Sequence, residues 1–374
     1  MTEVKFLHTS DWQLGMTRWF LEGEAQARFD DARLAAVSRI GEIAAAQGCA
    51  FIVVAGDVFE SNSLHRRTLG RVLEVLKALP VPVYLLPGNH DPLTADSVFY
   101  SAEQVPGVHV LSDFTPVDIV PGVQLIGAPL LSKRAVEDRV AAALQTVPDD
   151  DSLRILVGHG QVAGRGEVKP DLIDLPTVEA AIASGKISYL ALGDTHSTSP
   201  VGTTGAVWFS GSPEVTDFHD FTTAGGGESN SGNVLVVSID GTREVTVEQV
   251  PTGSWLFHAI EADLNSRADV EQFIARLDAY ENKSRVAIKY GLRGTLDLSA
   301  MQLLERELER LEPVFASLKP RARHMDLVLQ PEASDLEALN ISGYAKDALQ
   351  ELLAAEDPDA DAAVRLMFRL AKGA

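Results

Sequence analysis

Five short polar motifs, each placed directly after an apolar run, constrain what this chain can fold into. The motifs are Asp11-Trp12-Gln13, Gly56-Asp57-Val58-Phe59-Glu60, Gly88-Asn89-His90-Asp91, Gly158-His159-Gly160 and Gly193-Asp194-Thr195-His196. The apolar runs predict strands, and helical periodicity lies between several of them, which favours a layered α/β fold. In such folds the carboxyl ends of the strands meet at one edge. We therefore expect the five motifs to converge in space.

The first half of the chain alternates predicted strands and helices. Strands are expected at Val4–Thr9, Phe51–Ala55, Val81–Leu86, Leu153–Val157 and Ile187–Leu192, and helices at Gly23–Gln47 and Leu64–Leu79. Gly48 is the expected left-handed residue after the first helix. Further along, Val207–Gly211, Asn233–Ile239 and Glu244–Val250 are expected to be antiparallel strands, with a loop at Thr222–Gly232 and a hairpin signal at Asp240-Gly241.

Pro251-Thr252-Gly253 marks a predicted domain boundary. The chain divides into a main domain at 1–254, a smaller α/β domain at 255–332 and a helical tail at 333–374. The tail carries apolar stripes at Tyr344–Ala355 and Ala362–Ala371. Isolated helices of this length are marginal in water, so the stripes must pack either on the protein's own surface or on a partner protein.

The side chains in the motifs indicate a metal site. Carboxylate, amide and imidazole donors without a thiolate suit Mn²⁺, Mg²⁺ or Fe²⁺. Asp57 can bridge two cations, Asn89 offers a neutral amide oxygen, and the adjacent His90 is expected to point elsewhere and to act as a proton donor. Each motif alone could be a helix cap, a turn or a structural histidine. Five in series, containing three of the nine histidines, favour the two-metal interpretation.

Composition limits the compartment and the partners. The net charge is −21, with 53 acidic and 32 basic residues, which argues against tight, autonomous binding to DNA. The single cysteine, Cys49, excludes an intramolecular disulfide and fits a reducing compartment. We find no signal peptide and no apolar stretch long enough to span a membrane, so we expect a cytoplasmic protein without a membrane partner.

The motifs resemble those of the calcineurin-like metallophosphoesterase superfamily. Within it, His8-Thr9-Ser10-Asp11-Trp12, Gly56-Asp57-Val58-Phe59-Glu60 and Ser210-Gly211-Ser212-Pro213 resemble the SbcD-type DNA repair exonucleases, nuclease subunits that act beside an SMC-like coiled-coil ATPase. The resemblance implies a layered α/β fold: a β-sandwich flanked by helices, followed by a small α/β capping domain and the helical tail. It also implies hydrolysis of phosphodiester bonds in DNA and an ATPase partner, and it leaves a homodimer open.

The resemblance also implies the roles of individual residues. One divalent cation would be held by Asp11, Gln13, Asp57 and His196, and a second by Asp57, Asn89, His159 and Asp194. Manganese is the first choice, with magnesium and iron as alternatives. His90 would be the catalytic acid, with Asp91 beside it in the catalytic motif, and Ser210–Pro213 would run close to the site. His8 is expected to point away from the metals.

Two positions depart from the family pattern, which has histidine at positions 13 and 194, where this chain has Gln13 and Asp194. Both residues keep an oxygen that can bind a metal, although the amide is a weaker donor than imidazole. Two alternatives therefore stay open. One is a small-molecule phosphodiesterase or phosphatase of the same superfamily, and the other is a catalytically degenerate subunit that holds DNA or the ATPase. Arg18, Arg66 and Arg67 are either phosphate contacts or ordinary surface arginines.

Overall fold

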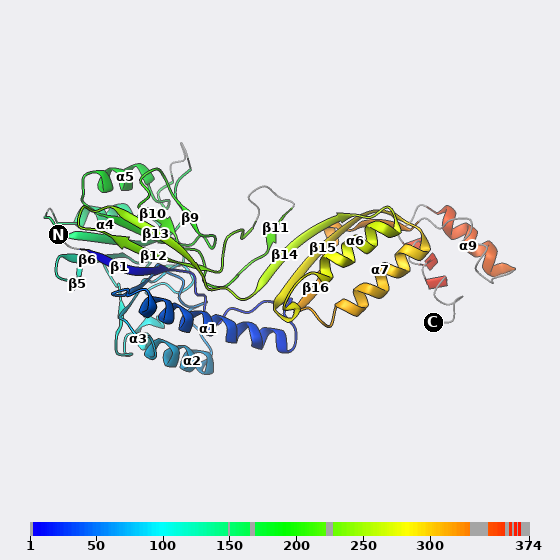
Figure 1. Ribbon diagram of the computed structural model, residues 1–374, viewed down its shortest axis with the longest axis horizontal. Helices are drawn as coiled ribbons and strands as arrows, with labels where there is room; N and C mark the ends of the chain where they lie inside the picture. The colour runs from blue at the N-terminus through cyan, green and yellow to red at the C-terminus, as the bar shows by residue number, and fades with distance from the viewer. Residues whose placement is uncertain are drawn as a thin grey trace. The chain divides into compact units, whose positions relative to one another are not determined.

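The computed structural model describes residues 3–148, 150–164, 169–221, 227–329 and 343–355, and the short pieces 359–360, 363–364 and 366–367. The chain divides into two compact units (Figure 1). The first comprises Met1–His219 and Gly225–Phe257, and the second comprises Asp220–Ala224 and His258–Ala374. None of the helices in the described residues has the length and apolar character that a membrane span needs.

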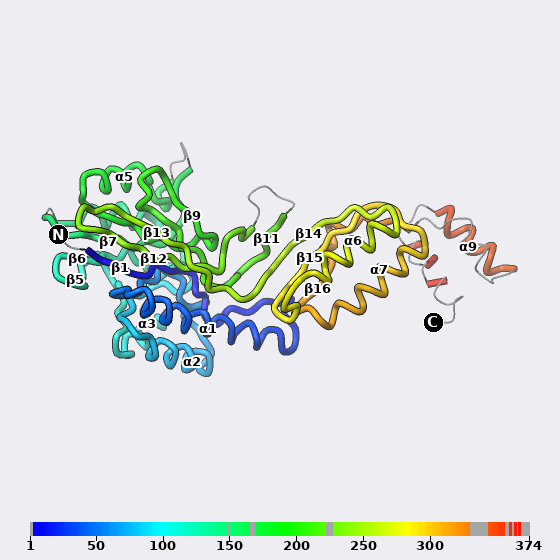
Figure 2. The backbone as a smooth tube through the Cα atoms, viewed as in Figure 1, coloured from blue at the N-terminus to red at the C-terminus, as the bar shows by residue number. Residues whose placement is uncertain are grey.

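Two six-stranded sheets form the first unit. One sheet has the order β13-β12-β1-β2-β3-β4. Its strands are β1 (Val4–Thr9), β2 (Ile52–Val54), β3 (Val83–Leu85), β4 (Val108–Val110), β12 (Asn233–Ile239) and β13 (Val245–Pro251). Strands β1 to β4 are parallel to one another, whereas β12 lies antiparallel beside β1 (Figure 2) and forms a hairpin with β13.

The other sheet has the order β5-β6-β7-β8-β10-β9. Its strands are β5 (Val117–Val120), β6 (Val123–Ala128), β7 (Leu153–His159), β8 (Tyr189–Gly193), β9 (Ser199–Pro200) and β10 (Val207–Phe209). Val207–Gly211 was expected to be an antiparallel strand, and this is wrong for the longer of its two pairings, the one with β8. Strand β10 runs parallel to β8 and is antiparallel only to the two-residue β9, because the chain turns back through β9 before β10 begins.

The two sheets pack face to face, and alternate side chains of each strand point to opposite faces. In β1, Phe6 enters the core between the sheets, where it stacks on Phe51, and Leu7 enters the core under the helices. Helices α1 (Glu24–Ala46), α2 (Arg66–Lys77) and α3 (Phe99–Ala102) cover one outer face, and α4 (Arg139–Thr146) and α5 (Leu175–Ala183) cover the other. The expected β-sandwich flanked by helices is confirmed.

The helix boundaries have local causes. Helix α1 buries the stripe that includes Phe29, Val37 and Ile40, and Gly48 follows it with a φ of 68°, as expected from the sequence. Helix α2 begins after His65, whose Nδ1 accepts a hydrogen bond from the backbone N–H of Arg67 at 3.3 Å. These caps satisfy backbone groups that the ends of a helix leave unpaired.

The second unit is a smaller sheet with helices on one face. Its strands are β15 (Val286–Leu296), β16 (Ser317–Pro320), β17 (Asp326–Leu329) and the later residues of β11 (His219–Asp220) and β14 (Leu256–Asp263), whose first residues belong to the first unit. Its helices are α6 (Arg267–Asp278) and α7 (Leu298–Leu311), and two 3₁₀ turns lie at Lys283–Arg285 and Ala322–His324. Strand β15 is long enough to pair with β16 along its first half and with β17 along its second. Side chains of α6 and α7 pack on this sheet in one hydrophobic core.

The described part of the C-terminal tail joins that same core. Helix α9 (Tyr344–Ala354) places Leu349 there, 2% exposed, and Val364 is 1% exposed in the same cluster. Leu352, Leu353 and Met367 pack against it in partly buried positions. Residues 333–342 and Leu370 of the predicted tail, and residues 330–332 of the predicted second domain, lie outside the described residues. The stripes therefore pack at least in part on the protein's own second unit.

Candidate metal centre

The motifs meet where the parallel strands of the first unit end. Asp11 follows β1, Asp57 follows β2 and Asn89 follows β3, all in one sheet, whereas His159 ends β7 and Asp194 follows β8 in the other. The polar groups at the ends of both sheets therefore share one region, as the position of the motifs after the strands predicts.

Backbone strain is concentrated at this region. Four of the six described residues other than glycine that have a positive φ belong to the motifs: Asp11 at 52°, Gln13 at 41°, Asp57 at 52° and Asp194 at 94°. A left-handed conformation costs a residue with a side chain about 1–2 kcal/mol. Hydrogen bonds from Asp11 N to Gly56 O at 3.0 Å and from Gln13 N to Asp57 O at 2.8 Å hold the two loops together. Such strain is typical of functional sites.

Asp11, Asp57 and His159 form a compact group of buried side chains that could hold a metal ion. One donor atom of each lies within 4.8 Å of the others. Nε2 of His159 is 3.4 Å from Oδ1 of Asp57 and 2.7 Å from Oδ1 of Asn89. Nδ1 of His159 lies 2.8 Å from the carbonyl oxygen of Ala55, so Nδ1 carries a proton, and Nε2 is the nitrogen that would bind a metal once the ring is neutral.

The electrostatics of this group favour a bound cation. Burial raises the pKa of Asp11, although His196 and His159 act in the opposite direction. Burial also opposes ionisation of Asp57, but His159 and the N–H of His90 outweigh it and lower the pKa of Asp57. Burial opposes protonation of His159, yet Asp57, Asp11 and Asp194 raise its pKa well above the usual value. Clustered buried carboxylates need a compensating positive charge.

His196 and Gln13 lie on the other side of Asp11. Nε2 of His196 is 3.8 Å from Oδ1 of Asp11 and 3.2 Å from Nε2 of Gln13. The buried Oε1 of Gln13 has no hydrogen-bond partner among the described residues, as expected for an oxygen that binds a metal. Burial opposes protonation of His196, but a hydrogen bond to Glu228 and the charge of Asp11 outweigh it and raise its pKa to about 8. The donor set therefore fits divalent cations.

Asp194 is tied to the centre through both its backbone and its side chain. Its N–H lies 3.2 Å from each carboxylate oxygen of Asp11. Its Oδ1 is 3.8 Å from Nε2 of His159, and its Oδ2 accepts a hydrogen bond from Gln161. The carboxylate at this position therefore faces the same group of ligands as His159.

His90 lies at the accessible side of the centre, with its side chain 38% exposed. Its backbone N–H donates to Oδ1 of Asp57 at 2.9 Å, and its ring Nδ1 is 3.2 Å from the carbonyl oxygen of Glu60. Asp91 is fully buried and accepts from the N–H groups of Phe59 and Gly88, each at 2.8 Å. Burial, with the charge of Asp57, raises the pKa of Asp91 to about 7. Asp91 therefore joins two motif loops rather than facing the substrate side.

The glycines in the motifs make room for the candidate metal ligands. A Cβ atom on Gly56, whose φ is 90°, would lie 2.1 Å from Nδ1 of His159. A Cβ on Gly88 would lie 2.2 Å from Oδ1 of Asp57. Neither distance is sterically tolerable, so the two glycines permit the close approach of loop and ligand.

Several residues that support the centre lie outside the set predicted from the sequence. The guanidinium of Arg33, buried in α1, donates to the carbonyl oxygens of Trp12, Asp11 and Val215 and so holds the first motif. The sequence feature that could have identified Arg33 is its position among the apolar residues of the buried stripe of α1. Gln161, Thr216 and Glu228 also make hydrogen bonds in or next to the centre. Their signals are weak, because isolated polar residues in loops are common.

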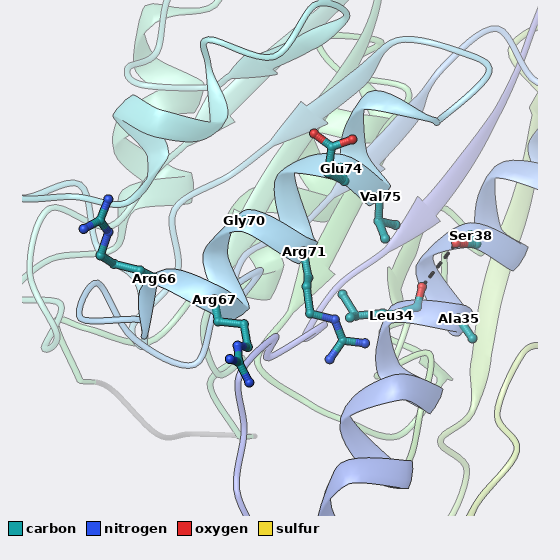
Figure 3. Close-up of a pocket in the computed structure, with 9 residues that line it drawn as sticks. All are labelled: Leu34, Ala35, Ser38, Arg66, Arg67, Gly70, Arg71, Glu74 and Val75. Carbon is teal, nitrogen blue, oxygen red and sulfur yellow. Dashed lines mark hydrogen bonds between the residues drawn. The ribbon is translucent and has the colours of Figure 1, made fainter.

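The arginines considered as phosphate contacts lie in different settings. Nε of Arg18 donates to the carbonyl oxygen of Thr216 at 2.8 Å, so this side chain anchors a loop. Arg66 and Arg67 line a cavity of about 510 Å³ between α1 and α2. In Figure 3, Arg71 projects toward α1, whereas Arg66 points away from it; Arg71 is paired with Asp31 of α1. Exposed arginines on a helix are ordinary surface features, and we assign this cavity no role.

The comparison with known families agrees with the geometry. Residues 4–198, slightly more than half of the chain, match the profile of the family described as calcineurin-like phosphoesterase. This chain belongs to the calcineurin-like phosphoesterase family, which confirms the resemblance in its motifs. The class of protein is thus a metal-dependent phosphoesterase, and Asp11, Asp57 and His159 form a candidate site for its divalent metal.

Individual relatives are more distant. The D subunit of the SbcCD nuclease of Rhodobacter capsulatus is 26% identical over 201 residues, which are 50% of this chain and 47% of that protein. The chain thus spans about half the length of this relative. Among solved structures, TT1561 of Thermus thermophilus is 13% identical, with a TM-score of 0.41 over 67% of this chain and 100% of that one. GAP50, the anchor in the inner membrane complex of Plasmodium, is 11% identical, with a TM-score of 0.40 over 67% and 85% of the two chains.

Proposed function

We propose that this chain hydrolyses phosphodiester bonds in DNA with the help of two divalent cations, as the nuclease subunit of an assembly with an SMC-like coiled-coil ATPase. The observation that carries the proposal is the convergence of the buried carboxylates of Asp11 and Asp57 with His159, His196 and Asn89 at the strand ends. The SbcD-type motifs and the relative that is named a nuclease subunit support DNA as the substrate.

The donors divide into two sets that share Asp57. Asp11, Gln13, Asp57 and His196 would hold one cation, and Asp57, Asn89, His159 and Asp194 the other. Oxygen donors with one imidazole in each set favour manganese, with magnesium or iron as alternatives. When bound, such cations activate a water molecule and neutralise the charge of the phosphate.

His90 is placed to donate the proton that the leaving oxygen needs. Because Nδ1 lies 3.2 Å from the carbonyl oxygen of Glu60, its proton is held there, and Nε2 faces the centre at 4.0 Å from Oδ2 of Asp57. The exposed ring can reach a bound phosphodiester. Asp91 positions the turn that carries His90 through its two backbone hydrogen bonds.

The charge of the chain bears on its partner. With a net charge of −21, the chain needs basic surface from elsewhere for tight binding to DNA, and an ATPase subunit would supply it. The same charge favours the second candidate function, a phosphodiesterase or phosphatase that acts on small molecules. The weaker donor Gln13 keeps a catalytically degenerate subunit as the third.

One experiment separates these functions. The full-length protein is incubated with Mn²⁺ or with EDTA, and the hydrolysis of end-labelled linear DNA is compared with that of bis(p-nitrophenyl) phosphate. We expect Mn²⁺-dependent cleavage of DNA that EDTA abolishes. Cleavage of the small ester alone would support the small-molecule enzyme, and metal-dependent retention of DNA without cleavage of either substrate would support the degenerate subunit.

A matched pair of variants ties the activity to the centre. Asp57→Asn removes the shared carboxylate, so Mn²⁺ affinity should fall by more than the 10–100-fold that loss of a supporting residue costs, and hydrolysis should be lost. Asp113→Asn makes the same chemical change at an exposed position. It should bind and hydrolyse like the parent. Equal behaviour of the two variants would refute the assignment of Asp57.

A further inference from the structure

We propose that Glu228 is a positioning residue of the metal centre, which acts through the hydroxyl group of Thr216 to fix the ring orientation and the tautomer of His196. This inference rests on the proposed metal-dependent function. It concerns two residues outside the five motifs, and it gives a reason for the buried glutamate at position 228, within a segment rich in glycine and serine.

The three side chains form a continuous hydrogen-bonded chain. Oγ1 of Thr216 lies 2.5 Å from Nδ1 of His196, and the same oxygen contacts Oε2 of Glu228. Oε2 of Glu228 is also 3.4 Å from Nδ1 of His196. On its other side, Nε2 of His196 faces Oδ1 of Asp11 at 3.8 Å. The chain thus leads from a buried carboxylate to the atom that would bind metal.

The direction of the hydrogen bonds follows from their chemistry. An ionised carboxylate can only accept, so the single hydroxyl proton of Thr216 goes to Glu228. The oxygen of Thr216 must then accept a proton from Nδ1 of His196. In the neutral ring the lone pair is consequently on Nε2, which is the form that a metal requires.

Glu228 also fixes the place of the hydroxyl group. Its Oε1 accepts from the N–H of Thr216 at 2.8 Å, and its Oε2 accepts from the N–H of Asp217 at 2.9 Å. The residue is 6% exposed. A buried carboxylate is costly unless it is fully paired, so a turn built around Glu228 holds Thr216 tightly.

The other histidine of the centre provides an internal comparison. Nδ1 of His159 is held by the backbone carbonyl of Ala55 at 2.8 Å, which no substitution at position 55 removes directly. For His196 the same task falls to two side chains. A side-chain substitution can therefore disturb the orientation of His196, whereas the backbone contact that holds His159 cannot be removed in this way.

The test uses the full-length protein and Mn²⁺, with free Mn²⁺ measured by electron paramagnetic resonance. In Glu228→Gln the amide can donate to Thr216, so the hydroxyl can turn toward Nδ1 and leave the proton of His196 on Nε2. We expect Glu228→Gln and Thr216→Val each to weaken Mn²⁺ binding about 10–100-fold, as the loss of a supporting partner typically does. Thr216→Ser keeps the hydroxyl group and should retain the parent affinity within about threefold.

Glu214→Gln is the matched control. Glu214 is also buried, 1% exposed, and its carboxylate also accepts backbone N–H groups, those of Ser254 and Trp255. Within the described part of the chain, its carboxylate bonds to these groups and not to His196. This variant should bind Mn²⁺ like the parent. Parent-like binding by either Thr216→Val or Glu228→Gln, or an equal loss in Glu214→Gln, would overturn the proposal.

A second measurement works on the metal-free protein. In alkaline buffer, where the ring is neutral, the ring ¹⁵N shifts should show one tautomer with the proton on Nδ1, as the contact with Thr216 requires, and His196→Asn assigns the signal. Thr216→Val should lose that single form while Thr216→Ser keeps it. A parent ring with its proton on Nε2 would refute the role of Glu228 even if metal binds. Failure of the parent to bind Mn²⁺ would refute the proposed function without altering the tautomer result.

Discussion

Nε2 of His159, at the end of β7, lies 3.4 Å from Oδ1 of Asp57, which follows β2 in the other sheet. The contact joins residues that are far apart in the sequence, and it exists only because the two sheets pack face to face with their strand ends aligned. Most of the candidate centre depends on this relationship.

His90→Ala should separate metal binding from hydrolysis. The side chain of His90 is 38% exposed, and its ring supplies no metal-binding atom to the group of Asp11, Asp57 and His159. The variant should therefore bind Mn²⁺ like the parent. Loss of a general acid costs about 10²–10⁴-fold in rate. Single-turnover cleavage of linear DNA at saturating Mn²⁺ measures the loss. Cleavage at the parent rate would exclude His90 as the acid.

Gln13→His should tighten metal binding. Imidazole is a better donor than an amide, and position 13 already faces His196 at 3.2 Å. We expect about a tenfold lower Kd for Mn²⁺ and higher activity at limiting Mn²⁺, which corresponds to about 1.4 kcal/mol. Gln104→His adds a histidine at an exposed position and controls for non-specific binding. Unchanged or weaker binding in Gln13→His would mean that the site is adapted to glutamine.

Gly56→Ala should displace His159. Both Gly56→Ala and Gly107→Ala place a side chain at a positive φ, 90° and 83°, which costs about 1–2 kcal/mol in each case. Only the Cβ at position 56 meets a neighbour, 2.1 Å from Nδ1 of His159, whereas none lies within 4 Å of a Cβ at position 107. Gly56→Ala should therefore lose more stability than Gly107→Ala, because the clash adds to the same backbone strain, and only Gly56→Ala should lose Mn²⁺ affinity. Calorimetric titration of both variants checks this difference.

The stability of the first unit should depend on pH through His8. The ring of His8 is buried against the hydroxyl group of Tyr189 at 3.0 Å and the carbonyl oxygen of Leu192 at 3.2 Å, pointing away from the centre as expected. Burial lowers the pKa of His8 from 6.5 to about 3. Between these values the unfolded chain binds a proton that the folded chain does not, so stability is complete above pH 6.5 and falls as the pH decreases.

The expected contribution of His8 is a slope of about 1.4 kcal/mol per pH unit in the free energy of unfolding between pH 6.5 and 3. Urea unfolding of the parent and of His8→Gln, which cannot be protonated, at several pH values isolates this slope. Identical pH profiles for the two proteins would show that the buried ring is not the source.

The tail offers a test of its own packing. Leu349 is 2% exposed in the core of the second unit, so Leu349→Ala should lower the free energy of unfolding by about 2–5 kcal/mol. Leu366 is 54% exposed, and Leu366→Ala should change it by less than about 0.5 kcal/mol. Denaturant unfolding followed by tryptophan fluorescence and circular dichroism gives both values. If Leu366→Ala instead abolishes co-purification with an SMC-like ATPase while the fold is intact, the exposed side of the tail is the docking surface.

Much of the first unit could be predicted from the sequence because its signals are local. The apolar runs of β1, β2, β3, β7 and β8 and the polar residues that follow them are adjacent in the chain, and parallel strands bring their carboxyl ends together. Gly48 ended α1 as predicted for the same reason, since a left-handed residue after a helix is a property of a few neighbouring residues.

Other features depended on the tertiary structure. The antiparallel direction predicted for Val207–Gly211 was wrong for the pairing of β10 with β8, because the sequence of a short strand does not specify which strand it pairs with. Glu228, Thr216 and Arg33 were missed, because their partners lie 11 or more residues away and become neighbours only after the sheets and α1 have packed. The apolar stripe on α9 predicted that this helix is buried on one side but did not predict the surface that covers it. In the structure, Leu349 packs in the core of the second unit. Local sequence thus determined which residues could bind metal, whereas packing decided which side chains orient them.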